Sequence, residues 1–187
     1  MEIPDMQSRS IIFPKICIAG KIASGKSILS QTLSASLGIA VVSLGKILRD
    51  YHIAHNLPAD RAYIQDFGKR LIEQFGGRGK FLWMINHSPD INWHQPLIID
   101  GFRSEDAYLQ CKGIYLKTLL IYCDCHDRIR LERIKSRDHL SEKEAIYILS
   151  HSSEDGVEAL HKHADIFFTP ESITEDLIIE IRAKLIS

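Results

Sequence analysis

The sequence has no apolar run long enough to cross a bilayer and no block of like charge. Its 24 acidic and 23 basic residues nearly balance, so nothing predicts a nucleic acid or an acidic membrane as the main partner. The start MEIPD lacks the basic and apolar segments of a secretory leader, which predicts a cytoplasmic protein. Repeats and low-complexity tracts are also absent. A chain of 187 residues, 45% of them hydrophobic, therefore predicts one globular domain over residues 1–187.

Cysteine is scarce, with four residues in the chain, and each lies in or beside a predicted strand or helix. We interpret them as reduced packing residues. Cys123 and Cys125 are separated by one residue, which is tighter than the usual C-x-x-C spacing, and no second ligand pair follows downstream. The cysteines therefore do not predict a metal site.

Residues 20–27, with the sequence GKIASGKS, fit the phosphate-binding pattern G-x-x-x-x-G-K-[ST]. The apolar run 15–19 before the pattern predicts a buried strand, and residues 27–33 after it have the apolar spacing of a helix. A strand, a glycine-rich turn and a helix start direct backbone N–H groups and the positive end of the helix dipole at one concavity. We expect this loop to bind a nucleoside triphosphate, ATP in our reading, through Gly20, Lys21, Ala23, Ser24, Gly25, Lys26 and Ser27.

Three residue types in this loop have distinct expected roles. Gly20 and Gly25 supply backbone freedom and let the chain approach an anion closely. Lys26 can reach the β- and γ-phosphates, and the hydroxyl of Ser27 can ligate Mg²⁺. Lys26 is therefore our first candidate catalytic residue, and Ser27 is a candidate metal ligand.

Strands and helices alternate along the chain. The first helix is expected to end near Gly38, a natural C-terminal cap, and residues 39–44 predict a second strand. Later strands are predicted around residues 97–100, 117–123 and 165–169, and an amphipathic helix over 173–186. This order predicts a five-stranded parallel sheet covered by helices, with ligands beyond the carboxyl ends of the strands.

A long helical segment separates the second and third strands. It runs from residue 45 to about 90, with expected breaks near residues 56–58 and 76–79. It is longer than a simple crossover requires, so we interpret it as an acceptor-binding insertion. Arg61 and Gln65 are four residues apart and would share a helix face, which suits either an anionic substrate or plain solvation.

The third strand ends in Asp100, followed shortly by Arg103. An acidic residue at this end of a strand beside a phosphate loop is well placed to hold Mg²⁺ or its water. Arg103 could pair with the acceptor phosphate or the transferred one. Asp100 could instead cap the next helix, but Ser104 already supplies that cap.

A further helix over residues 127–137 carries Arg133 and Arg137 four positions apart, hence on one face. Paired arginines near the end of a helix are candidates for a lid, which we expect over about 137–155. Ser141 and Glu144 form a capping-box pattern that starts another helix within it.

These motifs together resemble the P-loop kinases of the nucleoside monophosphate kinase family, the broad group with adenylate, cytidylate and dephospho-coenzyme A kinases. Residues 43–49, SLGKILR, are similar to an S-T-G-D-L-L-R stretch, and the resemblance makes Arg49 a ligand of the acceptor monophosphate. Residues 100–103, DGFR, are similar to D-G-F-P-R without its proline, which implies a phosphate contact for Arg103.

Two more stretches carry the resemblance. Residues 131–137, LERIKSR, are similar to the start of the lid, which implies that Arg133 stacks on the ATP base and Arg137 meets the transferred phosphoryl group. Residues 61–68 contain the R-x-x-x-Q-x-x-G spacing of dephospho-coenzyme A kinase-like and deoxynucleotide kinase-like proteins, which adds Arg61 and Gln65 as acceptor ligands.

The resemblance implies a three-layer P-loop kinase fold with core 14–44, 96–136 and 164–187. It also implies Mg²⁺-dependent transfer of the ATP γ-phosphoryl group to a small nucleotide-like acceptor, by a monomer or homodimer. Alternatives are a dephospho-coenzyme A kinase-like enzyme, a nucleotide-dependent switch and a non-catalytic nucleotide-binding module. Two departures bear on the acceptor: Lys46 stands where such kinases usually have an acid, and no arginine occurs between Arg137 and Arg182.

Overall fold

The computed structural model describes residues 14–150, 156–169 and 175–186. Five parallel strands in these ranges form one sheet of order β2-β3-β1-β4-β5. The strands are β1 (Lys15–Gly20), β2 (Ala40–Ser43), β3 (Leu97–Phe102), β4 (Thr118–Cys123) and β5 (Ile166–Phe168). The predicted α/β class and parallel sheet are confirmed. Because β1 lies between β3 and β4, the loop after β1 leaves from the middle of the sheet.

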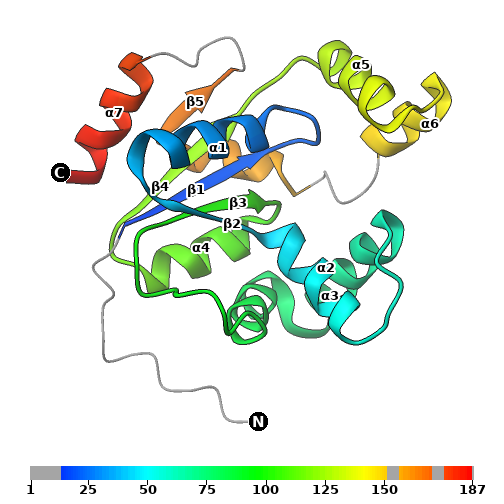
Figure 1. The fold of residues 1–187 in the computed structure, drawn as a ribbon, viewed down its shortest axis with the longest axis horizontal. Helices are drawn as coiled ribbons and strands as arrows, with labels where there is room; N and C mark the ends of the chain where they lie inside the picture. The colour runs from blue at the N-terminus through cyan, green and yellow to red at the C-terminus, as the bar shows by residue number, and fades with distance from the viewer. Residues whose placement is uncertain (1–13, 151–155, 170–174, 187) are drawn as a thin grey trace.

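Helices cover both faces of this sheet (Figure 1). Helices α1 (Lys26–Leu37) and α7 (Glu175–Ile186) lie on one face, and α4 (Glu105–Ile114) and the 3-10 helix η2 (Glu158–His163) lie on the other. Successive residues of β1 point to opposite faces. Ile16 and Ile18 therefore pack with α1 and α7, whereas Cys17 and Ala19 pack into the second core.

The ends of three helices follow the predicted capping signals. Gly38 ends α1 in the left-handed conformation, with φ of 68°, and its N–H donates to the carbonyl of Ser34. Ser104 caps α4, and Ser141 with Glu144 forms the predicted capping box of α6 (Glu142–Leu149). These local signals determined where the helices begin and end.

The helical insertion consists of α2 (Leu44–Ala54) and α3 (Arg61–Asn86). Both predicted breaks are present, since the chain leaves helical geometry between α2 and α3 and kinks inside α3 at Gly76, with φ of 71°. Gly77 then packs on the start of α4 so closely that a Cβ there would stand 2.6 Å from Ser104 Oγ. The kink turns the second part of α3 back along the first.

Helices α5 (Asp127–Asp138) and α6 lie across the same end of the sheet as α2 and α3 (Figure 1). Ile134 and Ala145 are fully buried and pack against Ile22 of the glycine-rich loop. The predicted lid helices are thereby attached to the loop that they would cover. Within the described ranges, no helix combines the length and apolarity that a membrane span requires.

Candidate active site

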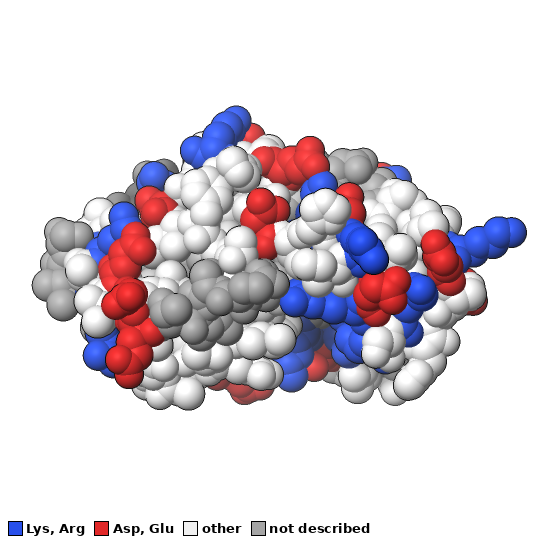
Figure 2. Space-filling model, turned by 90° about the horizontal axis from the view of Figure 1, so that it is seen from above, with Lys and Arg blue, Asp and Glu red and all other residues white. Residues whose placement is uncertain are grey.

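A cavity of about 1100 Å³ opens beyond the carboxyl ends of β1, β2 and β3. Doubly wound sheets bind ligands at this position, where neighbouring connections leave in opposite directions. Figure 2, which views the molecule from above the ribbon of Figure 1, shows basic side chains interspersed with acidic ones rather than a field of one sign. The cavity is lined by residues 22–28, Ser43, Gly45, Asp100, Gly101, Arg103, Arg128, Ile129, Glu132, Arg133, Ser136 and Arg137.

Lys26 is the first residue of α1, directly after Gly25, whose φ of 97° lets the loop turn into the helix. Its ammonium donates hydrogen bonds to the carbonyl oxygens of Gly20, at 2.7 Å, and Lys21, at 2.6 Å. The cation is therefore held over the loop by neutral acceptors. A phosphate oxygen would make a stronger, charge-assisted bond to the same ammonium.

Gly20 gives a direct test of the loop's geometry. Its φ is 144°, and a Cβ there would stand 2.5 Å from the Cys123 carbonyl oxygen and 2.7 Å from Ser24 Oγ. We expect Gly20→Ala to lower the free energy of unfolding by about 2–4 kcal/mol, through steric overlap and backbone strain. Chemical denaturation measures this change.

The matched control for that substitution is Gly113→Ala in α4, where an added Cβ meets no atom within 4 Å. An alanine in a helix is favoured over glycine by about 1 kcal/mol, so this variant should be as stable as the native chain or more stable. Equal stability of the two variants would contradict the close approach at Gly20.

Asp100 lies at the carboxyl end of β3, paired in register with Ile18 of β1 and Ser43 of β2. Its side chain is 9% exposed, and its buried Oδ1 has no hydrogen-bond partner among the described residues. Burial raises the pKa of this carboxyl group, although Lys26 and Arg103 act in the opposite direction. The site thus contains a buried acidic oxygen without a bonding partner.

Such an oxygen fits Mg²⁺. The hydroxyl-bearing Ser27 lines the same cavity, and Mg²⁺ is usually held by one or two protein oxygens together with phosphate and water oxygens. The described residues contain no group of three or more His, Cys, Asp or Glu side chains that could hold a metal by themselves. Ser27 and Asp100 are therefore suited to a metal ion that arrives with a nucleotide.

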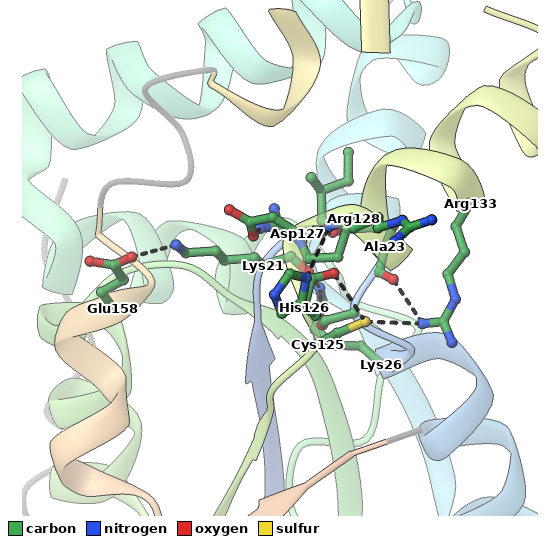
Figure 3. A network of polar contacts seen from close by, with 12 residues as sticks. Lys21, Ala23, Lys26, Cys125, His126, Asp127, Arg128, Arg133 and Glu158 are labelled. Atoms are coloured by element: carbon green, nitrogen blue, oxygen red, sulfur yellow. Dashed lines mark hydrogen bonds and ion pairs between the residues drawn. The ribbon is translucent and has the colours of Figure 1, made fainter. Parts of the chain in front are cut away.

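Arg133 and Arg137 both reach the cavity wall from α5. Arg133 donates to the carbonyl oxygen of Ala23 at 3.1 Å and to Cys125 Sγ at 3.5 Å, which places it beside the loop (Figure 3). The guanidinium of Arg137 binds both carboxylate oxygens of Asp138 at 2.7 Å, and this hydrogen bonding raises its pKa. The structure therefore brings both arginines predicted for the lid to the cavity, and Arg133 also contacts the glycine-rich loop.

Arg130 is a structural partner of the loop that the sequence reasoning missed. Its side chain is 2% exposed, and Nε donates to the carbonyl oxygen of Ile22 at 2.8 Å while Nη1 binds Asp127. The i, i+3 spacing of Asp127 and Arg130 was visible in the sequence, but it does not say which face of α5 contacts the loop.

Lys21, which we predicted to contact the nucleotide, has its side chain at a different cavity from Lys26. Its ammonium forms an ion pair with Glu158 of η2, on the opposite side of the loop from Arg133 (Figure 3). Both residues line a second, smaller cavity of about 390 Å³ that also contains Tyr122 and His161. In this structure the side chain of Lys21 lies at the smaller cavity, and its contact with a nucleotide stays a prediction.

The predicted acceptor residues do not all lie at the cavity. Arg103 lines the cavity, whereas Arg49 lies on the exposed face of α2 and Gln65 is half-buried in α3, both away from the cavity wall. The side chain of Arg61 lies outside the described part of the structure. Lys46 forms an exposed ion pair with Asp50 at 2.5 Å.

Two apolar residues complete the cavity wall and were missed from the sequence. Ile28 of α1 is 58% exposed and Ile129 of α5 is 41% exposed, although both are large hydrophobic residues. In a sequence, apolar residues at helical spacing indicate core positions. Only their position at the cavity shows that they offer an apolar surface to a ligand.

A five-stranded parallel sheet, a phosphate loop after its central strand and a cavity at the carboxyl ends define a P-loop nucleotide-binding protein with the kinase fold. The chain belongs to the AAA domain family, whose match covers residues 16–156. The resemblance to P-loop kinases is confirmed in the fold. A search of curated proteins finds no match.

Solved structures with this fold include kinases. A candidate kinase from Chloroflexus aurantiacus superimposes with a TM-score of 0.62 at 19% identity, covering 95% of this chain and 98% of the other. The APS kinase CysC of Mycobacterium tuberculosis, in complex with AMPPNP and APS, gives 0.59 at 15%, with coverage of 94% and 99%. Shikimate kinase from Acinetobacter baumannii, in complex with shikimate, gives 0.52 at 15%, with 94% of each chain covered. At these identities the likeness concerns the fold alone.

Proposed function

We propose that this protein is an ATP- and Mg²⁺-dependent kinase that transfers the γ-phosphoryl group to a small phosphorylated acceptor, such as a nucleoside monophosphate. One observation carries the proposal: a single cavity joins Lys26 of the phosphate loop, Arg103, and the buried carboxylate of Asp100, whose Oδ1 has no hydrogen-bond partner among the described residues. A nucleotide switch requires the first two features, but it does not require an arginine at the end of β3.

The donor half of the cavity would hold ATP. The triphosphate would lie on the amides of the loop and on Lys26, which can exchange its neutral carbonyl partners for charged oxygens. The base would lie along the apolar surface of Ile28 and Ile129, near Arg133. Ser27 and Asp100 would hold Mg²⁺, which would neutralise negative charge on the phosphate groups.

In the proposed reaction, an oxygen of the acceptor attacks the γ-phosphorus in line, the bond to the β,γ-bridging oxygen breaks, and ADP leaves. Phosphoryl transfer requires mainly positioning and charge neutralisation from the protein. Lys26, Arg103, Arg133 and Arg137 would supply positive charge around the transferred group. Helices α5 and α6, attached to the loop through Ile22, would exclude water when they close.

The acceptor remains the open half of the proposal. Two neighbours with this fold are kinases in complex with different small compounds, APS in one and shikimate in the other. Arg103 favours a phosphorylated acceptor, because guanidinium groups bind phosphate with two parallel hydrogen bonds. Dephospho-coenzyme A is the second acceptor class that we propose to test. The cytoplasmic location and the monomeric or homodimeric state stay predictions from the sequence.

Acceptor-dependent ADP formation tests the function. The purified protein with Mg²⁺ and ATP is assayed against nucleoside and deoxynucleoside monophosphates, dephospho-coenzyme A, APS and shikimate. We expect at least one phosphorylated compound to raise ADP formation at least about tenfold over the acceptor-free rate, with phosphorylated product formed in equal amount. ATP hydrolysis that no acceptor stimulates, but that a protein partner does, would indicate a switch instead.

A non-catalytic nucleotide-binding module is the competing function, and one observation favours it. The chain has no arginine between Arg137 and Arg182, and Lys162 and His163 both pair with Glu105 at the start of α4, at 2.9 and 2.6 Å. Those two side chains are therefore engaged with Glu105, and neither lines the cavity. Binding of AMPPNP without phosphoryl transfer to any acceptor would support this alternative.

A further inference from the structure

We propose that Lys80 of α3 is the second cation of the acceptor site and that, together with Arg103, it binds a phosphate monoester group of the acceptor. This inference rests on the proposed function and specifies the chemistry of its acceptor side. Neither the sequence motifs nor the comparisons point to Lys80. The position follows from the way in which α3 folds back on itself.

The geometry begins with the kink at Gly76, which turns the second part of α3 and with it Lys80 toward the first part. The ammonium nitrogen of Lys80 lies 3.0 Å from the place where a Cβ on Gly68 would stand, and Leu48 of α2 lies beside the same point. Gly77, three residues before Lys80, packs against Ser104, since a Cβ at Gly77 would stand 2.6 Å from Ser104 Oγ. Ser104 directly follows Arg103, which lines the cavity, so this part of α3 lies beside the segment that carries Arg103.

The charges around Lys80 leave its ammonium uncompensated. No carboxylate among the described residues forms an ion pair with it, and the charged group that acts on it is another cation, Arg103. Burial, and to a smaller extent the charge of Arg103, lower the pKa of Lys80 to about 8. Lys80 and Arg103 repel each other electrostatically, which raises the free energy of the unliganded protein. An anion bound between them would remove this repulsion.

Lys15 shows what a structural buried lysine looks like in the same molecule. Its pKa is also lowered to about 8 by burial, but its ammonium donates to the carbonyl oxygen of Gln95 at 2.8 Å and lies 4.2 Å from the centre of the Tyr115 ring. Lys15 therefore has partners within the fold. No comparable hydrogen bond or ring contact of Lys80 is found in the described ranges.

The number of cations favours a phosphate monoester over a carboxylate. A phosphate monoester carries a charge of about −1.5 to −2 at pH 7, which matches two cations, whereas a carboxylate carries −1. The segment after Arg137 supplies no arginine before Arg182. In this proposal, positive charge on the acceptor side comes from Arg103, which follows β3, and from Lys80 of α3.

The same geometry gives a physical reason for a glycine at position 68. It is the last residue of the R-x-x-x-Q-x-x-G stretch, and it is buried in the first part of α3. A side chain at this position would meet the end of the Lys80 side chain. Because that end is flexible, Gly68→Ala should displace the ammonium without removing its charge and without disrupting the helix.

Binding to the complex with Mg²⁺ and AMPPNP tests the inference by calorimetry, with AMP, CMP, GMP, UMP and inorganic phosphate as probes. For Lys80→Met we expect the dissociation constant of the bound monophosphate to rise about 10- to 100-fold, because a charge-assisted hydrogen bond is lost. The dissociation constant of AMPPNP should not change. The corresponding nucleoside, which lacks the phosphate, should bind native protein and variant equally weakly.

Two further variants separate a binding role from a structural one. Lys69→Met removes an exposed lysine of the same helix, whose ammonium is 4.0 Å from Glu73, and should leave monophosphate binding unchanged. Gly68→Ala should weaken binding several-fold, about 3- to 10-fold, while its melting temperature stays equal or rises. Lys80→Met should also melt no lower than the native chain at pH 7, since it removes a buried charge.

The pH dependence adds a readout that packing alone would not change. Gly68 of α3 and Leu48 of α2 contact the end of the Lys80 side chain, and the charged group that acts on it is Arg103 after β3. As the pH rises from 7 to 9.5, Lys80 loses its proton, so the dissociation constant should rise in the native protein but stay flat in Lys80→Met.

Unchanged affinity for a monophosphate in Lys80→Met, or a large fall in its melting temperature, would overturn the inference. Failure of the kinase proposal gives a different pattern, namely monophosphate or phosphate binding that depends on Lys80 without ADP formation. If neither phosphate nor any monophosphate binds the native complex, the acceptor site itself is disproved.

Discussion

Replacement of Lys26 by alanine is expected to lower acceptor-dependent ADP formation at least about 10³-fold, the size of effect seen when a group that stabilises transition-state charge is removed. Lys26 starts α1 and holds its ammonium over the loop through the carbonyl oxygens of Gly20 and Lys21. No other lysine lines the larger cavity among the described residues. Steady-state kinetics with the best acceptor from the panel measures the loss.

The fold should survive this substitution, because the ammonium of Lys26 donates to loop oxygens and the residue lies outside the two main cores. Lys112→Ala, an exposed lysine of α4, is the matched control and should retain full activity. Thermal unfolding of both variants should follow that of the native protein. Normal turnover in Lys26→Ala would disprove the assignment of the loop as the donor site.

Asp100→Asn is expected to lower turnover about 10²- to 10³-fold and, in the absence of nucleotide, to raise stability at neutral pH. The carboxylate is buried, and its Oδ1 has no hydrogen-bond partner in the described structure, so its charge is costly until Mg²⁺ and a nucleotide arrive. Asparagine keeps the shape and removes the charge.

The raised pKa of Asp100 also predicts how the stability of the native protein depends on pH. Because burial raises the pKa of Asp100 above its ordinary value of 3.8, the folded state binds more protons than the unfolded state just above that value. The free energy of unfolding therefore falls as the pH rises through this window, and the cost persists at neutral pH. Asp100→Asn should lack this fall.

Thermal unfolding from pH 3.5 to 8, with and without Mg²⁺ and AMPPNP, tests the metal-binding role of Asp100 and the fall of stability with rising pH. The native protein should be stabilised by the pair of ligands, and Asp100→Asn should lose most of the Mg²⁺-dependent part. Ser150→Ala, at an exposed position at the end of α6, serves as the surface control. A variant that needs Mg²⁺ as the native enzyme does would show that Asp100 does not hold the metal.

Local signals in the sequence were sufficient for the elements of the fold. The apolar run before the glycine-rich loop predicted β1, Gly38 predicted the end of α1, and Ser104 predicted the start of α4. These signals succeed because caps and buried runs act over a few residues. The kinase-like resemblance then supplied the three-layer arrangement, which the sheet order confirms.

Candidate site residues near the loop could also be predicted from the sequence. Lys26, Asp100 and Arg103 follow strands whose carboxyl ends meet at one edge, so their convergence follows from the parallel order. Arg49 was placed by resemblance to a motif, and it lies on an exposed face of α2 away from the cavity wall. Motif similarity gives a position on a helix, but the helix orientation decides what that position faces.

Residues 20–27 by themselves determined that this chain carries a phosphate loop, because every group that cradles an anion there belongs to one short segment. Only the tertiary structure decided that Arg130 anchors this loop, that Lys21 turns away from it to Glu158, and that Lys80 lies over Gly68 beside Arg103. The physical reason is that these contacts join elements distant in sequence. Their geometry depends on a kink and on helix packing, which no local pattern specifies.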